Sequence, residues 1–190
     1  DANFDEITYA KGLESLQNVG GNAYFHRLTS AEGLTSLQQI AGDANFDEIT
    51  YAKGLESLQN VGGNAYFHRL TSAEGLTSLQ QIAGDANFDE ITYAKGLESL
   101  QNVGGNAYFH RLTSAEGLTS LQQIAGDANF DKITNAKGLE SLQNIGGHAY
   151  FYSLIRAEGL DSLQHIGNTT NQYVQKVIEK NNQANIKHHH

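Results

Sequence analysis

Apolar side chains recur at every third position over most of each repeat, from Phe25 to Ile40 in the second one, and one further apolar residue lies two positions before the Phe. In residues 22–42 the apolar positions are Ala23, Phe25, Leu28, Ala31, Leu34, Leu37 and Ile40. A spacing of three matches neither the 3.6-residue period of an amphipathic helix nor the two-residue period of a β-strand. The pattern therefore predicts a chain that turns continuously around a narrow apolar core.

The same pattern returns every 21 residues. The first 126 residues are three identical copies of a 42-residue unit, and residues 127–168 are a diverged fourth copy. Residues 21–28 align with residues 42–49, so each unit holds two 21-residue coils. One phenylalanine marks each coil: Phe4, Phe25, Phe46, Phe67, Phe88, Phe109, Phe130 and Phe151. Because one coil cannot bury its apolar side chains alone, we predict that eight coils stack into one elongated solenoid with a shared core.

Each coil contains one predicted strand and one predicted helical stretch. Ala23, Tyr24 and Phe25 alternate between inward apolar and outward polar side chains, as in a β-strand. Residues 31–39 are predicted to be helical or 3₁₀, and Gly33 limits that stretch to about two turns or fewer. We therefore expect a parallel β-sheet along one face of the solenoid and short helical segments along another.

A family resemblance is carried by residues 12–25. They read Gly12-Leu13-Glu14-Ser15-Leu16-Gln17-Asn18-Val19-Gly20-Gly21-Asn22-Ala23-Tyr24-Phe25. This segment resembles the short bacterial leucine-rich repeats of the receptor-L type, and the resemblance extends over residues 1–168. It implies an α/β, leucine-rich-repeat-like solenoid with a role in recognition and no catalysis. The sequence departs from the family at Ala23, which replaces a strand leucine, and at Leu28, which stands where the family places its ladder asparagine. A closed parallel β-helix is the alternative that the spacing of three also permits.

The period breaks after residue 168. In residues 169–187 the apolar side chains of Tyr173, Val174, Val177 and Ile178 fall on one face of a helix. We predict that this segment is a capping helix over the last coil. The final residues, 188–190, are all histidine and are interpreted as the remains of a purification tag.

The first coil has no predicted cap. The sequence starts inside a predicted strand, so the apolar side chains of Ala2, Phe4 and Ile7 are expected at an uncovered end of the core. An uncovered strand edge favours pairing with another chain. We therefore predict a homodimer that forms through the two first coils.

Composition narrows the chemistry that the chain can perform. The sequence contains no Cys, so disulfides, thiolate nucleophiles and Cys-based metal sites are excluded. Its net charge of −9 argues against nucleic acid as a partner, and no apolar run reaches the ~20 residues that a membrane span needs. We expect no cofactor, no nucleic acid partner and no membrane partner.

Because coils repeat position for position, each outward side chain is expected to form a row along the solenoid. One row combines His26, Asp47, His68, Asp89 and His110, and a parallel row combines Tyr24, Asn45, Tyr66, Asn87 and Tyr108. Tyr and His are good contact residues, so this Tyr/His face is the predicted binding face for a protein or carbohydrate ligand. Imidazole beside carboxylate also makes His26, Asp47 and His68 weak candidates for a metal site. A catalytic role is not expected, because no nucleophile stands in a sheltered position beside them.

Two further rows alternate in charge along the stack. One contains Arg27, Glu48 and Arg69, and the other contains Glu32, Lys53 and Glu74. A slip of one coil would place like charges opposite each other, so these rows are predicted to control the register of stacking.

The first three units have the same sequence, and this bears on the origin and the role of the chain. Natural repeats diverge, so perfect copies predict an array engineered from one parent unit. We interpret the chain as a non-enzymatic repeat scaffold with a structural, self-assembling role. A binding module on the Tyr/His face and weak metal binding by the His and Asp row are the alternatives.

Overall fold

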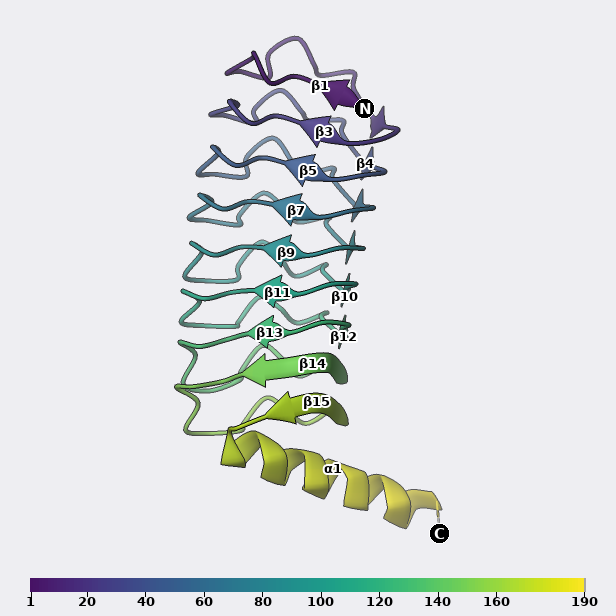
Figure 1. Ribbon diagram of the computed structural model, residues 1–190, viewed down its shortest axis with the longest axis vertical. Helices are drawn as coiled ribbons and strands as arrows, with labels where there is room; N and C mark the ends of the chain where they lie inside the picture. The colour runs from purple at the N-terminus through teal and green to yellow at the C-terminus, as the bar shows by residue number, and fades with distance from the viewer. Residues whose placement is uncertain (190) are drawn as a thin grey trace.

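Successive 21-residue coils stack in parallel, and the stack ends in one helix (Figure 1). In this computed structural model residues 1–189 are described, with side chains described for residues 1–186. The predicted solenoid of 21-residue coils is confirmed: Ala23 of one coil pairs in register with Ala44 of the next. The architecture is a parallel β-solenoid.

Two columns of short strands run along the solenoid. The first column consists of β1 (Ala2–Asn3), β3 (Ala23–Tyr24), β5 (Ala44–Asn45), β7 (Ala65–Tyr66), β9 (Ala86–Asn87), β11 (Ala107–Tyr108) and β13 (Ala128–Asn129). The second column consists of β2 (Asn18–Val19), β4 (Gln39–Ile40), β6 (Asn60–Val61), β8 (Gln81–Ile82), β10 (Asn102–Val103) and β12 (Gln123–Ile124). The long strand β14 (Asn144–Tyr150) joins both columns, and β15 (His165–Thr169) pairs with it.

The helical stretch predicted for residues 31–39 is not observed. Single turns take its place: the Leu34 N–H donates to the Ala31 carbonyl at 3.0 Å, and the Leu37 N–H donates to the Leu34 carbonyl at 3.1 Å. Gly33 has φ of +113°, a left-handed conformation that interrupts a helix. Between residues 1 and 171 the described chain contains turns and strands only, so the α/β arrangement implied by the family resemblance does not appear.

The core is one continuous column centred on stacked phenylalanine rings. Consecutive rings, from Phe4 to Phe151, have centroids 4.9–5.6 Å apart and planes within 15° of parallel. Leu28, Leu34 and Leu37 are also fully buried, and so are their equivalents in the middle coils. Each buried side chain of this size contributes roughly 1.5–3 kcal/mol, so the stacking of coils supplies the stability that a single coil lacks.

The helix α1 (Gln172–His189) lies against the last coil. Its first turn is capped by Asn171, whose Oδ1 accepts hydrogen bonds from the Tyr173 and Val174 N–H groups at 2.9 and 3.2 Å. Val174 is fully buried. Asn181 donates from Nδ2 to the carbonyl oxygens of Leu160 and Leu163 at 3.0 and 2.8 Å, which ties the helix to the last coil. The predicted purification tag is residues 188–190. Residues 188 and 189 are the last two residues of α1, and their side chains are not described. His190 lies outside the described residues. Within the described part of the chain, no helix is both long and apolar enough to cross a membrane.

A ladder of Asp and Asn side chains connects the backbones of neighbouring coils. This Asx ladder consists of Asp1, Asn22, Asp43, Asn64, Asp85, Asn106 and Asp127. In each member, Oδ1 accepts the backbone N–H of the equivalent residue in the next coil, at 2.7–2.9 Å. The ladder therefore satisfies one backbone donor per coil at the corner between the two strand columns.

Candidate functional site

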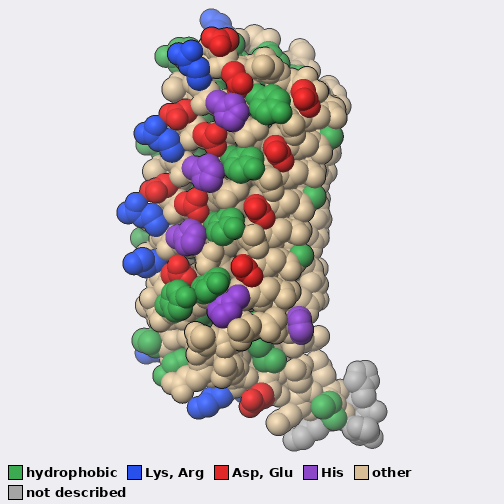
Figure 2. Space-filling view, viewed as in Figure 1, with side chains coloured by type: hydrophobic (Ala, Val, Ile, Leu, Met, Phe, Trp, Pro, Cys, Tyr) green, Lys and Arg blue, Asp and Glu red, His purple; other side chains and the backbone are tan. Residues whose placement is uncertain are grey.

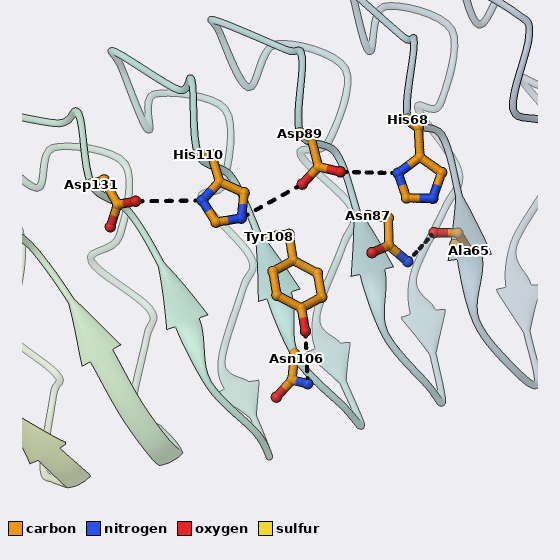
Figure 3. A network of polar contacts seen from close by, with 8 residues as sticks. All are labelled: Ala65, His68, Asn87, Asp89, Asn106, Tyr108, His110 and Asp131. Atoms are coloured by element: carbon orange, nitrogen blue, oxygen red, sulfur yellow. Dashed lines mark hydrogen bonds and ion pairs between the residues drawn. The ribbon is translucent and has the colours of Figure 1, made fainter.

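The histidines and aspartates of the predicted row form a line beyond the first strand column. This His–Asp ladder contains His26, Asp47, His68, Asp89, His110 and Asp131. Figure 3 shows the part of the ladder from His68 to Asp131. Nδ1 of His26 lies 3.0 Å from Oδ2 of Asp47, and the same atoms of His68 and Asp89 are 2.9 Å apart. Each histidine therefore contacts the aspartate of the following coil.

Two ladder histidines lie between two carboxylates each. His110 is 3.7 Å from Asp89 through Nε2 and 3.4 Å from Asp131 through Nδ1 (Figure 3). His26 similarly lies 3.8 Å from Asp5 through Nε2. The imidazole side chains are 42–44% exposed, so the ladder is an open line of paired groups.

The three candidate metal ligands do not converge on one point. His26 contacts Asp47, whereas the Nδ1 atom of His68 is directed to Asp89. In the part of the chain that the structure describes, no cluster of three or more His, Asp or Glu side chains has a geometry that could hold a metal ion. A line of ligands spaced by one coil provides pairwise contacts and no cage.

The tyrosines of the Tyr/His face hydrogen-bond within their own coil. The hydroxyl of Tyr24 accepts from Nδ2 of Asn22 at 2.8 Å, and the hydroxyl of Tyr66 accepts from Nδ2 of Asn64 at 3.0 Å. The Tyr24 ring stacks on His26 with centroids 5.9 Å apart. These tyrosines are half-buried, so much of their aromatic surface covers the sheet.

The asparagines that alternate with these tyrosines are buried. Asn45 and Asn87 are each 7% exposed, and Nδ2 of Asn87 donates to the Ala65 carbonyl at 3.2 Å (Figure 3). The remaining predicted member, Tyr108, repeats the Tyr66 arrangement with Asn106. The row is therefore held in place by contacts within the solenoid.

Oppositely charged side chains meet at each of the first five junctions between coils. Pairs from the two charged rows alternate along the stack: Arg27–Glu6 (3.7 Å), Lys53–Glu32 (3.4 Å), Arg69–Glu48 (2.8 Å), Lys95–Glu74 (3.6 Å) and Arg111–Glu90 (2.8 Å). In Figure 2 the Lys and Arg side chains follow the edge beside the histidine column. Because they are exposed, each pair contributes only about 0–1 kcal/mol, and their alternation disfavours a slip of one coil.

The exposed carboxyl of Glu14 accepts a backbone hydrogen bond from its own turn. The Gly12 N–H donates to Oε1 of Glu14 at 3.1 Å, and this hydrogen bond lowers the pKa of the Glu14 carboxyl from its ordinary value. Glu56, its equivalent in the third coil, accepts the Gly54 N–H in the same way at 2.9 Å. These contacts fix the position of the carboxyls at the turns.

The predicted dimer edge lies in the first coil. Ala2, Phe4 and Ile7 are half-buried, and they pack on the core from one side only. Their counterparts in the second coil, Ala23 and Phe25 among them, are fully buried. Ala2, Phe4 and Ile7 are therefore less covered than these counterparts, and their role as a dimer edge stays a prediction.

A second row of tyrosines was not identified from the sequence. Tyr9, Tyr51 and Tyr93 are 70%, 68% and 65% exposed, and they occur once in each identical unit. They form single parallel bridges to Ser30, Ser72 and Ser114, on the part of the coil between the two strand columns. The sequence does mark this row: Tyr51, for example, lies two positions after the core residue Ile49, and the preceding coil has Ser30 at the equivalent position.

The fold defines the chain as a repeat protein of the parallel β-solenoid class. Comparison of the chain with protein-family models, curated proteins and solved structures found no match.

Proposed function

We propose that the chain is a non-catalytic structural scaffold, a rod whose shape is held by contacts between successive, structurally equivalent coils. The observation that carries this proposal is the His–Asp ladder, in which potentially reactive side chains pair along the rod. Nδ1 of His68 and Oδ2 of Asp89, for example, form a hydrogen-bonded contact between coils at 2.9 Å on an open surface. General acid–base or nucleophilic chemistry needs such groups to converge around a bound substrate, and a straight ladder does not bring them together.

The proposal includes an engineered origin from one parent unit. Three identical copies support it, because independent drift would have left differences between them. The fourth unit carries scattered changes such as Lys132, Asn135 and His148, which are typical of natural variation. The turn-rich coil retains the leucine positions that resemble short bacterial leucine-rich repeats, and those repeats are the proposed parent.

Self-association through the first coil is the proposed assembly mode. A second copy placed on this end would cover Ala2, Phe4 and Ile7, which pack on the core from one side only. Replacing Phe4 with Asp is then expected to convert a dimer into a monomer in light scattering over a concentration series. A wild-type chain that remains monomeric throughout the series would exclude this mode.

The scaffold role is tested by chain length and by chelation. Variants that lack residues 1–42 or residues 1–84 keep whole units and the helix α1. Their urea midpoints should fall with each unit removed, because each unit contributes interfaces between coils. The full chain should unfold at the same urea concentration with and without EDTA. Equal midpoints for the three lengths, or unfolding caused by EDTA, would contradict the proposal.

A binding module on the Tyr/His face is the second candidate. It is favoured by the exposure of the imidazoles, 42% for His26 and 44% for His68, beside the rings of Tyr24 and Tyr66. Saturable binding of a protein or carbohydrate that is lost in the Tyr66→Ala variant would support this candidate over the pure scaffold.

A further inference from the structure

Two equivalent surface pockets surround Tyr51 and Tyr93, two of the exposed tyrosines of the second row. The first, of about 600 Å³, is lined by Tyr51, Ser72, Lys53 and three glutamates, Glu32, Glu56 and Glu74. The second, of about 550 Å³, is lined in the same manner by Tyr93, Ser114, Lys95, Glu74, Glu98 and Glu116. The pockets share Glu74, so they form one continuous strip along the solenoid.

Each pocket has an excess of negative charge around an aromatic ring. Three carboxylates stand against one ammonium group in each. In the first pocket the ammonium of Lys53 is paired with Glu32 at 3.4 Å, and Glu74 is paired with Lys95 of the second pocket at 3.6 Å. Glu56 is the glutamate of the first pocket that lies outside these two lysine pairs. A protonated amine that enters the pocket is attracted both by the carboxylates and by the face of an exposed tyrosine.

The spacing of the pockets selects the shape of the ligand. Tyr51 and Tyr93 are separated by two coils, which corresponds to ~10 Å along the solenoid. In an extended 1,4-linked β-glycan alternate sugar rings are turned over, so the same ring face returns at every second sugar. One sugar is about as long as one coil is high. Such a chain, lying along the solenoid, would place alternate sugars on Tyr51 and Tyr93.

We propose that the strip formed by Tyr9, Tyr51 and Tyr93 with its glutamates binds an extended 1,4-linked β-glycan that carries amino groups, a glucosamine polymer. The tyrosines stack on alternate sugar rings, and the glutamates pair with the protonated amines between them. Glu74, shared by both pockets, faces the sugar that links the two stacked rings. The strip ends in the fourth unit, where Asn135 occupies the tyrosine position. This binding role goes beyond the scaffold role and does not depend on it.

The test is calorimetric titration of the full chain with the β-1,4-linked glucosamine hexamer, in a buffer that keeps its amines protonated. The wild type is expected to bind, and the Tyr51→Ala/Tyr93→Ala double variant should lose affinity by about tenfold or more. Both tyrosines are exposed, so the double variant should melt at the wild-type temperature. Tyr152→Ala is the matched control, because Tyr152 is 67% exposed but occupies the histidine position of the other face. This control should bind as the wild type does.

Two further ligands separate the contributions of ring and charge. The glucose hexamer with the same linkage should bind more weakly because it has no amines, and hexalysine should bind more weakly because it has no sugar rings. No binding of the glucosamine hexamer overturns the proposal. So does equal affinity of the double variant, and so does equal or tighter binding of the glucose hexamer or of hexalysine.

Discussion

Oδ1 of Asn22 accepts the backbone N–H of Asp43 at 2.7 Å, and Oδ1 of Asp43 accepts the N–H of Asn64 at the same distance. Asp and Asn alternate in this Asx ladder because each offers the acceptor oxygen that the contact needs. The ladder ends at His148, whose N–H still donates to Oδ1 of Asp127 but whose side chain has no oxygen to continue the ladder.

Loss of one ladder oxygen should destabilise the fold. Asp85 accepts the Asn106 N–H at 2.7 Å, and Asp85→Leu would leave that donor without its partner. We expect the free energy of unfolding to fall by about 1–3 kcal/mol in urea titrations. Asp85→Asn keeps an acceptor oxygen and should stay close to the wild type. If the two variants lose equal stability, the charge of Asp85 matters and its hydrogen bond does not.

The glycine before each ladder residue makes room for the ladder oxygen. A Cβ on Gly84 would collide with Oδ1 of Asn64, although the φ of Gly84 is not in the left-handed region. Gly84→Ala should therefore reduce the unfolding free energy by about 1–3 kcal/mol, the range typical of overpacking. Gly20→Ala is the control, because a Cβ there meets no atom within 4 Å. A larger loss at Gly20 than at Gly84 would refute this explanation.

The contribution of the phenylalanine column should depend on position in the stack. Phe67 is fully buried between Phe46 and Phe88, with centroids 5.4 Å from each. Phe67→Ala should lower the unfolding free energy by about 3–5 kcal/mol, and Phe4→Ala should lower it less, because Phe4 has a ring on one side only. Chemical denaturation of the two variants checks this order. Equal losses would show that the coils do not share one core.

Charge reversal tests the register function of the charged rows. Arg69 donates to Glu48 at 2.8 Å, and the two side chains are 62% and 43% exposed. Arg69→Glu alone should destabilise the fold by no more than about 1 kcal/mol, through repulsion from Glu48. The double exchange with Glu48→Arg should recover part of the loss, as a double-mutant cycle measures. A loss that the exchange leaves unchanged would mean that the two side chains act independently.

The parts of the structure that depend on repeat period were predictable, and the local hydrogen-bond pattern was not. The 21-residue period and the inward position of Phe25 follow directly from the sequence and are confirmed by the stacked rings. Residues 31–39 were predicted to be helical because successive turns with i→i−3 hydrogen bonds and a 3₁₀ helix share the same spacing of three. The strand Gln39–Ile40 is too short to show an alternating pattern.

For the polar ladders too, the sequence predicted which residues share a row but not which groups they hydrogen-bond. The sequence placed His26 and Asp47 in one row, and the structure brings them to 3.0 Å. The Asx ladder at Asn22 was not predicted from the sequence. The resembled family has its ladder asparagine at the position of Leu28, which cannot form such a ladder. Asp and Asn alternate at the true position, and their shared function depends on a backbone donor in the next coil.

The sequence by itself determined that the protein is a stack of equivalent coils around one apolar column, because a strict period repeats every side-chain environment. Tertiary structure alone decided which outward side chains remain free. Tyr24 and Tyr51 have the same chemistry in sequence, yet Tyr24 is half-buried and bonded to Asn22, whereas Tyr51 is 68% exposed in a pocket. The difference arises from the path of the coil, which places the Tyr24 ring over a sheet and the Tyr51 ring beside a turn. The sequence pattern of one coil does not show which of the two rings is covered.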